Sequence, residues 1–112
     1  MKKPTESYLG FAKKSGNLLA GYNTCVSAMN KGKVKLLIIC EDIAENSMEK
    51  ITCLARANQT KYRIYGHSDV LGPACGSPGR AIFGITDAGF ADTIAKAIEQ
   101  ERIETSEEKE VQ

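Results

Sequence analysis

Sequence elements that would identify a membrane-spanning or metal-binding protein are missing from this chain. No segment approaches the roughly twenty consecutive apolar residues that a helix needs to cross a bilayer. No two cysteines form a C-x-x-C pair, and a single histidine, His67, is present to help build a metal site. We therefore expect no membrane span, no metal or cofactor, and reduced core cysteines in a cytoplasmic protein. The cysteines are Cys25, Cys40, Cys53 and Cys75.

Sequence motifs and catalytic side chains typical of enzymes are also scarce. Neither Gly10–Gly16 nor Gly76–Arg80 fits a phosphate-binding loop or a dinucleotide-binding motif. The lone His67 offers little for nucleophilic catalysis. Glu41 and Asp42 are the one adjacent carboxylate pair in residues 1–98, and they lack metal ligands nearby in sequence. We expect that the protein is not an enzyme.

Carboxylates are also absent from residues 7–40, although the whole chain has 14 Asp and Glu. Five lysines lie in this stretch: Lys13, Lys14, Lys31, Lys33 and Lys35. Positive charge without acids to repel phosphates is typical of a surface that binds RNA or DNA. An ordinary solvated face would have the same composition, so this alternative stays open.

The length and the charge distribution predict one domain with an acidic end. A chain of 112 residues suits a single domain. Residues 1–98 hold thirteen Lys and Arg against eight Asp and Glu, a charge of +5, whereas residues 99–112 hold two against six, a charge of −4. We expect a domain over residues 1–104 and a disordered acidic tail over residues 105–112. The tail either competes for the basic surface or only aids solubility.

Helical and strand-like patterns alternate along the chain. Helix starts are expected near residues 5–7, 23–24, 47, 68–69 and 87. In the first of these helices, Tyr8, Leu9, Phe11 and Ala12 are expected to form the apolar face. Strands are expected near residues 18–20, 34–40, 62–65 and 81–85. The second of these is apolar on both faces, as expected for the centre of a sheet that is covered on both sides. The order predicts an α/β protein, a three-layer α/β/α sandwich with a small mixed four-stranded sheet.

Four stretches, in this order and spacing, give the chain a family resemblance. The stretches are Gly10–Gly16, Gly21–Asn23 with Asn30–Lys33, Lys35–Asp42, and Leu71–Gly76 leading to Arg80. With them the chain resembles the ribosomal protein L7Ae/L30e/S12e family over roughly residues 7 to 95, and within that family the small bacterial YlxQ-like members. The resemblance implies the same sandwich fold and a non-enzymatic, structured-RNA-binding protein, with ribosomal RNA as a candidate target.

The resemblance also implies how RNA would be bound. Family members typically bind a kink-turn, a sharply bent RNA helix with sheared G·A pairs. The glycine turn and the start of the second helix enter the RNA groove, and an Asn that matches Asn23 hydrogen-bonds a guanine. Thr24 and Ser27 stand where the family often has Glu and Lys, which puts kink-turn affinity in question. The loop Gly76–Arg80 matches the one that packs on a flipped-out base.

Physical arguments support the same residues. Gly21 permits a bend that a Cβ would block, and the amide of Asn23 has donors and an acceptor that match a purine edge. Lysines after the helix would contact phosphates, and the Arg80 guanidinium can stack on a base. The predicted RNA-binding residues are Gly21, Tyr22, Asn23, Thr24, Ser27, Lys31, Lys33, Pro78, Gly79 and Arg80.

Simpler roles for these residues remain open. Asn23 or Thr24 could only cap the helix, Tyr22 could pack against the sheet, and Arg80 could pair with Asp69 or Asp87. We predict a monomeric RNA-binding protein associated with the ribosome. The alternative is a protein-interaction module that keeps the fold and has lost kink-turn recognition, an alternative that Thr24 and Ser27 support.

Overall fold

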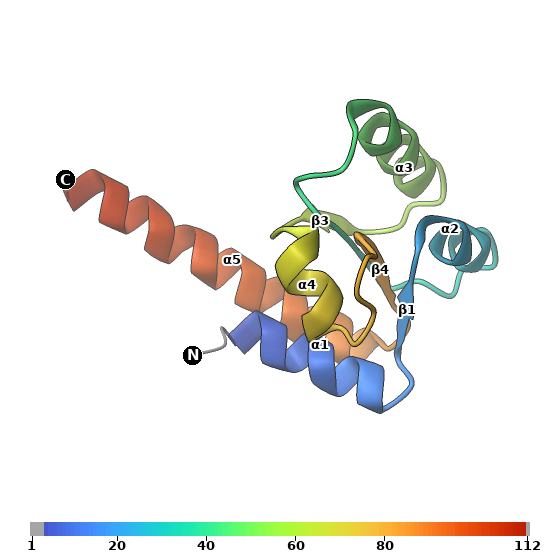
Figure 1. Cartoon of the computed structure of the whole chain (residues 1–112), viewed down its shortest axis with the longest axis horizontal. Helices are drawn as coiled ribbons and strands as arrows, with labels where there is room; N and C mark the ends of the chain where they lie inside the picture. The colour runs from blue at the N-terminus through green and yellow to red at the C-terminus, as the bar shows by residue number, and fades with distance from the viewer. Residues whose placement is uncertain (1–3, 112) are drawn as a thin grey trace.

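A computed structural model describes residues 4–111, with the surroundings of side chains given for residues 4–102. Helices and strands alternate, as the sequence predicts. In chain order the elements are α1 (Pro4–Lys14), β1 (Leu18–Ala20), α2 (Tyr22–Asn30), β2 (Leu36–Ile39), α3 (Glu45–Ala57), β3 (Tyr62–Ile64), α4 (Ser68–Ala74), β4 (Ile82–Ile85) and α5 (Ala88–Val111). Helices α2 and α3 lie on one side of the sheet, and α1, α4 and α5 on the other (Figure 1). The predicted three-layer α/β/α arrangement is confirmed.

The sheet is mixed and has the strand order β1-β4-β2-β3. Strand β4 is antiparallel to both β1 and β2, whereas β2 and β3 run parallel. In this register Ile38 of β2 lies opposite Phe83 of β4 on one side and Arg63 of β3 on the other. Helix α3 connects the parallel strands β2 and β3, because parallel neighbours need a crossover connection of about a dozen residues or more.

Strand β2 is buried on both faces because its neighbours cover both. Leu36 and Ile38 pack in the cluster beneath α1, α4 and α5, and Leu37 and Ile39 pack in the cluster beneath α2 and α3. All four side chains are fully buried. Each contributes about 1.5–3 kcal/mol relative to an exposed side chain. The prediction of a central strand covered on both sides is confirmed.

Helix α2 sits close to the sheet because β4 has a glycine beneath it. A methyl group placed on Gly84 would lie 3.4 Å from Sγ of Cys25 and 3.3 Å from a methyl carbon of Val34. Contacts this short mean that Val34 or Cys25 would have to shift slightly to admit even a methyl group. Cys25 belongs to α2, so Gly84 sets how near that helix approaches the sheet.

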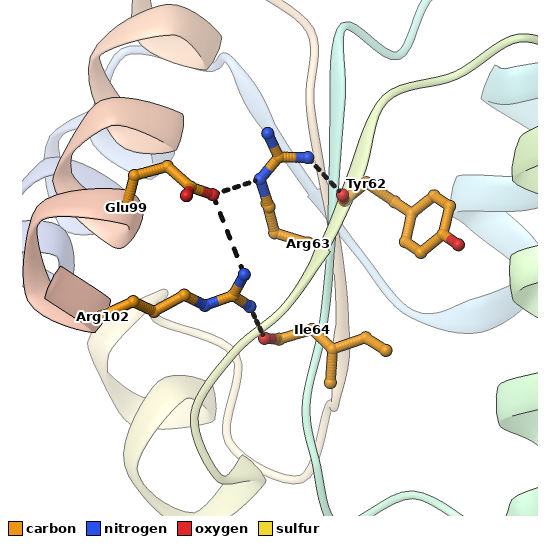
Figure 2. Close-up of polar contacts among 5 residues, drawn as sticks. All are labelled: Tyr62, Arg63, Ile64, Glu99 and Arg102. Atoms are coloured by element: carbon orange, nitrogen blue, oxygen red, sulfur yellow. Dashed lines mark hydrogen bonds and ion pairs between the residues drawn. The ribbon is translucent and has the colours of Figure 1, made fainter. Parts of the chain in front are cut away.

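The exposed edge of β3 is closed by arginines (Figure 2). Arg63 contacts Glu99 of α5 with Nε 2.9 Å from Oε1, and it donates a hydrogen bond to its neighbour, the carbonyl of Tyr62. Arg102 of α5 donates to the carbonyl of Ile64 and lies 3.8 Å from Glu99. Edge strands with free backbone groups invite pairing with other chains. Here two carbonyls of the edge are occupied, and both arginines have a carboxylate partner.

Two apolar expectations are wrong. Phe11, expected on the buried face of the first helix, is 57% exposed, because the buried stripe of α1 runs through Thr5, Leu9 and Ala12. Thr5 can point inward since its hydroxyl donates to Oε1 of Glu101 at 2.9 Å. Cys53, expected in the core, is exposed on α3, while the other three cysteines are buried and all four are free.

The C-terminal part of the chain belongs to α5, which projects beyond the sheet (Figure 1). The domain boundary at residue 104 and the disordered tail over residues 105–112 stay predictions; α5 is drawn through Val111, and residue 112 lies outside the described residues. Within residues 4–111, no helix is both long enough and apolar enough to cross a membrane.

Candidate nucleic-acid interface

Helix α2 begins at a glycine, not at a polar capping residue. Gly21 is the N-cap, with φ 105° and ψ 149°, and no side chain bonds to the first turn. Because this φ is one that residues with a Cβ rarely adopt, the bend depends on glycine. The prediction that Asn23 or Thr24 caps the helix is wrong: the helix already starts at Tyr22, so both residues lie inside its first turn.

The start of α2 therefore leaves its polar groups open. The Gly21 N–H donates to the Ile82 carbonyl at 2.8 Å, and the Gly21 carbonyl accepts the first helical bond from Cys25 at 3.1 Å. The N–H groups of the first helical turn have no carbonyl of the helix to bond. Asn23 is exposed, and its amide has no hydrogen-bond partner among the described residues. Donors and an acceptor are thus available at the positive end of a helix dipole.

A groove runs from this turn along the side of α2. Its volume is about 850 Å³, and no carboxylate lines it. The polar residues that line it come from three segments: Asn23, Thr24, Ser27, Lys31, Lys33, Lys35 and Thr86. Thr24 and Ser27 are exposed, as are the three lysines. Five predicted site residues therefore share one basic groove, and the structure adds Lys35 and Thr86 to them.

The loop that precedes β4 meets the Gly21 turn. A methyl group placed on Gly21 would lie 3.6 Å from Nη1 of Arg80. The loop folds back on α4, since Ser77 N–H donates to the Gly72 carbonyl at 2.8 Å and Arg80 N–H donates to the Ser77 carbonyl at 3.2 Å. Arg80 forms no ion pair within the described part of the chain, so the alternative of pairing with Asp69 or Asp87 is wrong.

The remaining two residues of the predicted loop contact are exposed. Pro78 and Gly79 lie at the tip of the turn between Ser77 and Arg80. Neither lines the groove beside α2. The predicted residues thus form two adjoining surfaces that meet where Arg80 lies on Gly21.

Sequence reasoning missed a lysine beside this loop. A methyl group on Gly76 would lie 3.4 Å from Cγ and 3.8 Å from Cε of Lys13, so the aliphatic part of Lys13 covers the start of the loop. Lys13 follows from the carboxylate-free stretch, but only the packing of α1 on α4 shows its position. Lys35, in contrast, is one of the lysines after the helix that the sequence predicts to contact phosphates.

Tyr22 has a structural contact. Its side chain is half-buried and packs against the core beneath α2 and α3. The alternative that Tyr22 packs against the body of the protein is therefore confirmed. Tyr22 is the first residue of α2, so this contact joins the start of the helix to the core.

The basic side chains fall into two groups. In the described part of the chain, ion pairs join Arg63 and Arg102 to Glu99, and Lys96 to Asp92. None of the lysines in the groove beside α2 has such a partner there. His67, the residue before α4, is exposed, with Nε2 3.6 Å from Glu41.

Buried thiols do not add chemistry to this region. Burial raises the pKa of the Cys25 thiol to about 12, so the thiol stays protonated near neutral pH. Its Sγ lies 3.8 Å from the Leu19 carbonyl and 3.9 Å from the Ile82 carbonyl. Across residues whose side chains are described, no group of three or more potential ligands could hold a metal ion.

Fold and groove together define a class: a small α/β/α protein with an open, basic helix start, as suits binding a polyanion. A model of the ribosomal protein L7Ae/L30e/S12e/Gadd45 family matches residues 3–101. The chain belongs to this family, a family of non-enzymatic RNA-binding proteins.

Individual relatives agree with this assignment. The chain is 24% identical over 91 residues to the RNA-binding protein YlxQ of Bacillus subtilis, and the match covers 81% of this chain and 91% of the relative. It is 32% identical over 106 residues to the large ribosomal subunit protein eL30 of Oryza sativa subsp. japonica, and the match covers 88% of this chain and 94% of the relative. The family resemblance that the sequence motifs predict is confirmed.

Solved structures support the fold. A protein of unknown function from Bacillus halodurans is 30% identical, with a TM-score of 0.84, and the match covers 88% of this chain and 99% of that one. A 15.5kD RNA binding protein of Giardia lamblia is 19% identical, with a TM-score of 0.69, and the match covers 85% and 82%. At that identity the second likeness shows the fold alone.

Proposed function

We propose that this protein binds structured RNA, of the kink-turn type, as a monomer in the cytoplasm. The start of α2 enters the RNA groove, where Asn23 hydrogen-bonds the edge of a guanine. The observation that carries the proposal is the free amide of Asn23 on an open helix start, in a groove without carboxylates. If Asn23 capped α2, its side chain would bond to an N–H of the first turn, and no such hydrogen bond is present.

The surroundings supply the non-specific part of the binding energy. Lys31, Lys33 and Lys35 line the groove and have no acidic partner among the described residues, so they are available to phosphates. The N–H groups at the start of α2 also favour anions, because they carry partial positive charge and have no carbonyl partner in the helix. Arg80, held against Gly21, adds a planar cation next to the amide, with Pro78 and Gly79 beside it at the loop tip.

Two side chains limit how strongly a kink-turn would be bound. Thr24 offers a hydroxyl where a carboxylate would accept two hydrogen bonds from a guanine, and Ser27 places no charge near a phosphate. We therefore expect lower affinity than in relatives with Glu and Lys at these positions. Should specific recognition be lost altogether, the protein-interaction module is the second candidate.

The relatives suggest where the RNA is found. YlxQ is named as an RNA-binding protein and eL30 as a protein of the large ribosomal subunit. Ribosomal RNA is accordingly the first target to test. Crosslinking the protein to RNA in cells and sequencing the attached RNA would identify it.

Binding to a kink-turn RNA and to a straight duplex of equal length tests the proposal. Affinities are measured at about 50 mM and about 200 mM salt, a range over which contacts to several phosphates weaken binding steeply. We expect tighter binding of the kink-turn at both concentrations, because only a bent groove lets Asn23 and Arg80 contact the RNA together. Equal affinity for both RNAs would exclude bend recognition, and weak binding without salt dependence would favour the protein-interaction module.

A further inference from the structure

Phe11 on α1 is an exposed aromatic residue, with 57% of its surface in contact with solvent. A single exposed apolar side chain is common on protein surfaces. What distinguishes Phe11 is its position on the wall of a groove between α1 and α4, with a volume of about 350 Å³. This volume is near the lower limit for sites that hold a small molecule or one nucleotide.

Small residues make the floor of this groove. A methyl group placed on Gly10 would lie 3.4 Å from the carbonyl oxygen of Ala74, so the two helices pass each other closely at this point (Figure 1). Pro73 and Gly76 continue the lining on the side of α4. This slot between α1 and α4 is thus lined by one aromatic ring together with small residues, a lining that can accommodate a planar ring.

The charge at the two ends of the slot is different. Lys13 and Lys14 line it at the C-terminal end of α1, and neither has an ion-pair partner among the described residues. Glu6 and Ser7 line it nearer the start of α1. Phosphates are therefore favoured beside the lysines, while the Glu6 carboxylate can accept hydrogen bonds from a base but repels a phosphate.

The slot adjoins the surface proposed to bind structured RNA. The aliphatic part of Lys13 packs over Gly76, the first residue of the loop that leads to Arg80. Arg80 in turn lies against Gly21, where α2 begins. A nucleic-acid strand that leaves the groove beside α2 can thus reach Phe11 over a surface that carries Arg80 and Lys13.

We propose that an unpaired nucleotide next to the structured part of the RNA enters this slot and stacks its base on Phe11, with its phosphate beside Lys13 and Lys14. The inference rests on the proposed RNA-binding function and adds a single-stranded element to the target. Stacking on aromatic rings tolerates any base, and lysines hold the backbone. A protein partner would need a larger apolar face than one ring and a slot of this volume.

The test uses the full chain and RNAs that share one kink-turn, with and without an unpaired extension. One RNA ends at its stems, and the other carries a short unpaired extension, placed in separate samples at each end of the molecule. We expect one of the two extensions to strengthen binding by about tenfold, the effect of one stacked base. A photoreactive thiouridine in that extension should crosslink to the segment that contains Phe11.

Variants at Phe11 separate stacking from general hydrophobicity. Phe11→Ala and Phe11→Leu should remove the gain from the extension and leave binding of the plain kink-turn unchanged, whereas Phe11→Tyr should retain the gain. Because the side chain is mostly exposed, these variants should fold, which circular dichroism will verify. A gain that survives in both Phe11→Ala and Phe11→Leu would overturn the proposal.

The outcomes also distinguish this proposal from the one on which it rests. If the protein binds the plain kink-turn and neither extension adds affinity, only the stacking slot is excluded. If it binds none of the RNAs, both proposals fail. Concentration-dependent dimerisation that Phe11→Ala abolishes would likewise overturn the stacking slot and assign the ring to a contact between two copies of the chain.

Discussion

At the scale of single residues, Asn23 shows how far composition and spacing can lead. The sequence identifies the residue, but capping and RNA binding both require an exposed polar side chain at a helix start. The structure removes the capping alternative because Gly21 occupies the cap and the helix begins at Tyr22.

Asn23→Ala should weaken binding of a kink-turn RNA by about 1–3 kcal/mol, the cost of one lost contact to a base edge. The free energy of unfolding in urea should barely change, because no cap bond is lost. Asn46→Ala is a matched control: Asn46 is also an exposed second residue of a helix, α3, whose N-cap is Ala44. A variant at Asn23 that unfolds more easily but binds RNA as before would assign the residue a structural role.

At the scale of elements, α4 depends on a carboxylate from another segment. Its N-cap, His67, makes no side-chain cap bond, and the helix has only seven residues. Asp42, after β2, accepts hydrogen bonds from the N–H and the hydroxyl of Ser68, at 2.9 and 2.5 Å. The loop that carries Arg80 follows α4, so the start of this helix helps to fix the candidate interface.

The bonds from Ser68 hold the pKa of Asp42 below its ordinary value, with a smaller contribution from nearby His67. A lowered pKa in the folded state means that Asp42 stabilises the fold above the pKa of an unfolded Asp, about 4, and that this contribution is lost as the pH falls below it. We expect the free energy of unfolding to decrease between neutral pH and about pH 3, and to decrease less in Asp42→Asn. An identical pH dependence in the variant and the wild type would contradict this role.

At the scale of the whole molecule, positive charges with and without partners lie in different regions. Arg63 and Arg102 are held by Glu99 at the β3 edge (Figure 2). Lys31 and Lys33 beside α2, in contrast, have no acidic partner in the described part of the chain. The net charge of +1 hides this separation. Steering of a polyanion depends on such local fields and not on the net charge.

Lys33→Ala should weaken binding to kink-turn and duplex RNA alike and lower the slope of log affinity against log salt by about 1, because one phosphate contact is lost. Lys96→Ala is the control, since Lys96 is paired with Asp92 on α5, with Nζ 3.1 Å from Oδ2. The control should leave both quantities unchanged. A loss confined to the kink-turn would instead show that Lys33 contributes to specific recognition.

The fold was largely predictable because burial patterns repeat with the period of each element. β2 is apolar on both faces, and Asp87 was expected to open the last helix; its Oδ2 accepts the N–H of Phe90 at 2.9 Å. Phe11 could not be placed, because α1 turns Thr5 inward, and that depends on Glu101 in a distant helix. Spacing alone cannot foresee a polar residue that is satisfied across the fold.

The candidate site was predictable in part. The carboxylate-free stretch and the family motifs identified the residues along α2, since these are local in sequence. The contact of Arg80 with Gly21 and of Lys13 with Gly76 depends on how separate elements pack, which no local pattern encodes. The cap was misassigned because Asn is a good capping residue and the bend at Gly21 made the cap unnecessary.

Gly84 of β4 lies beneath α2, the helix that carries Asn23, and lets that helix pack close to the sheet. Because a Cβ at this position would lie 3.4 Å from Sγ of Cys25, added bulk at residue 84 would press on α2 from the side of the sheet. Such pressure would displace the amide of Asn23 outward from the sheet. A larger residue at this buried position would therefore test the proposed interface from inside the protein, because it would move Asn23 without removing any group that faces the RNA.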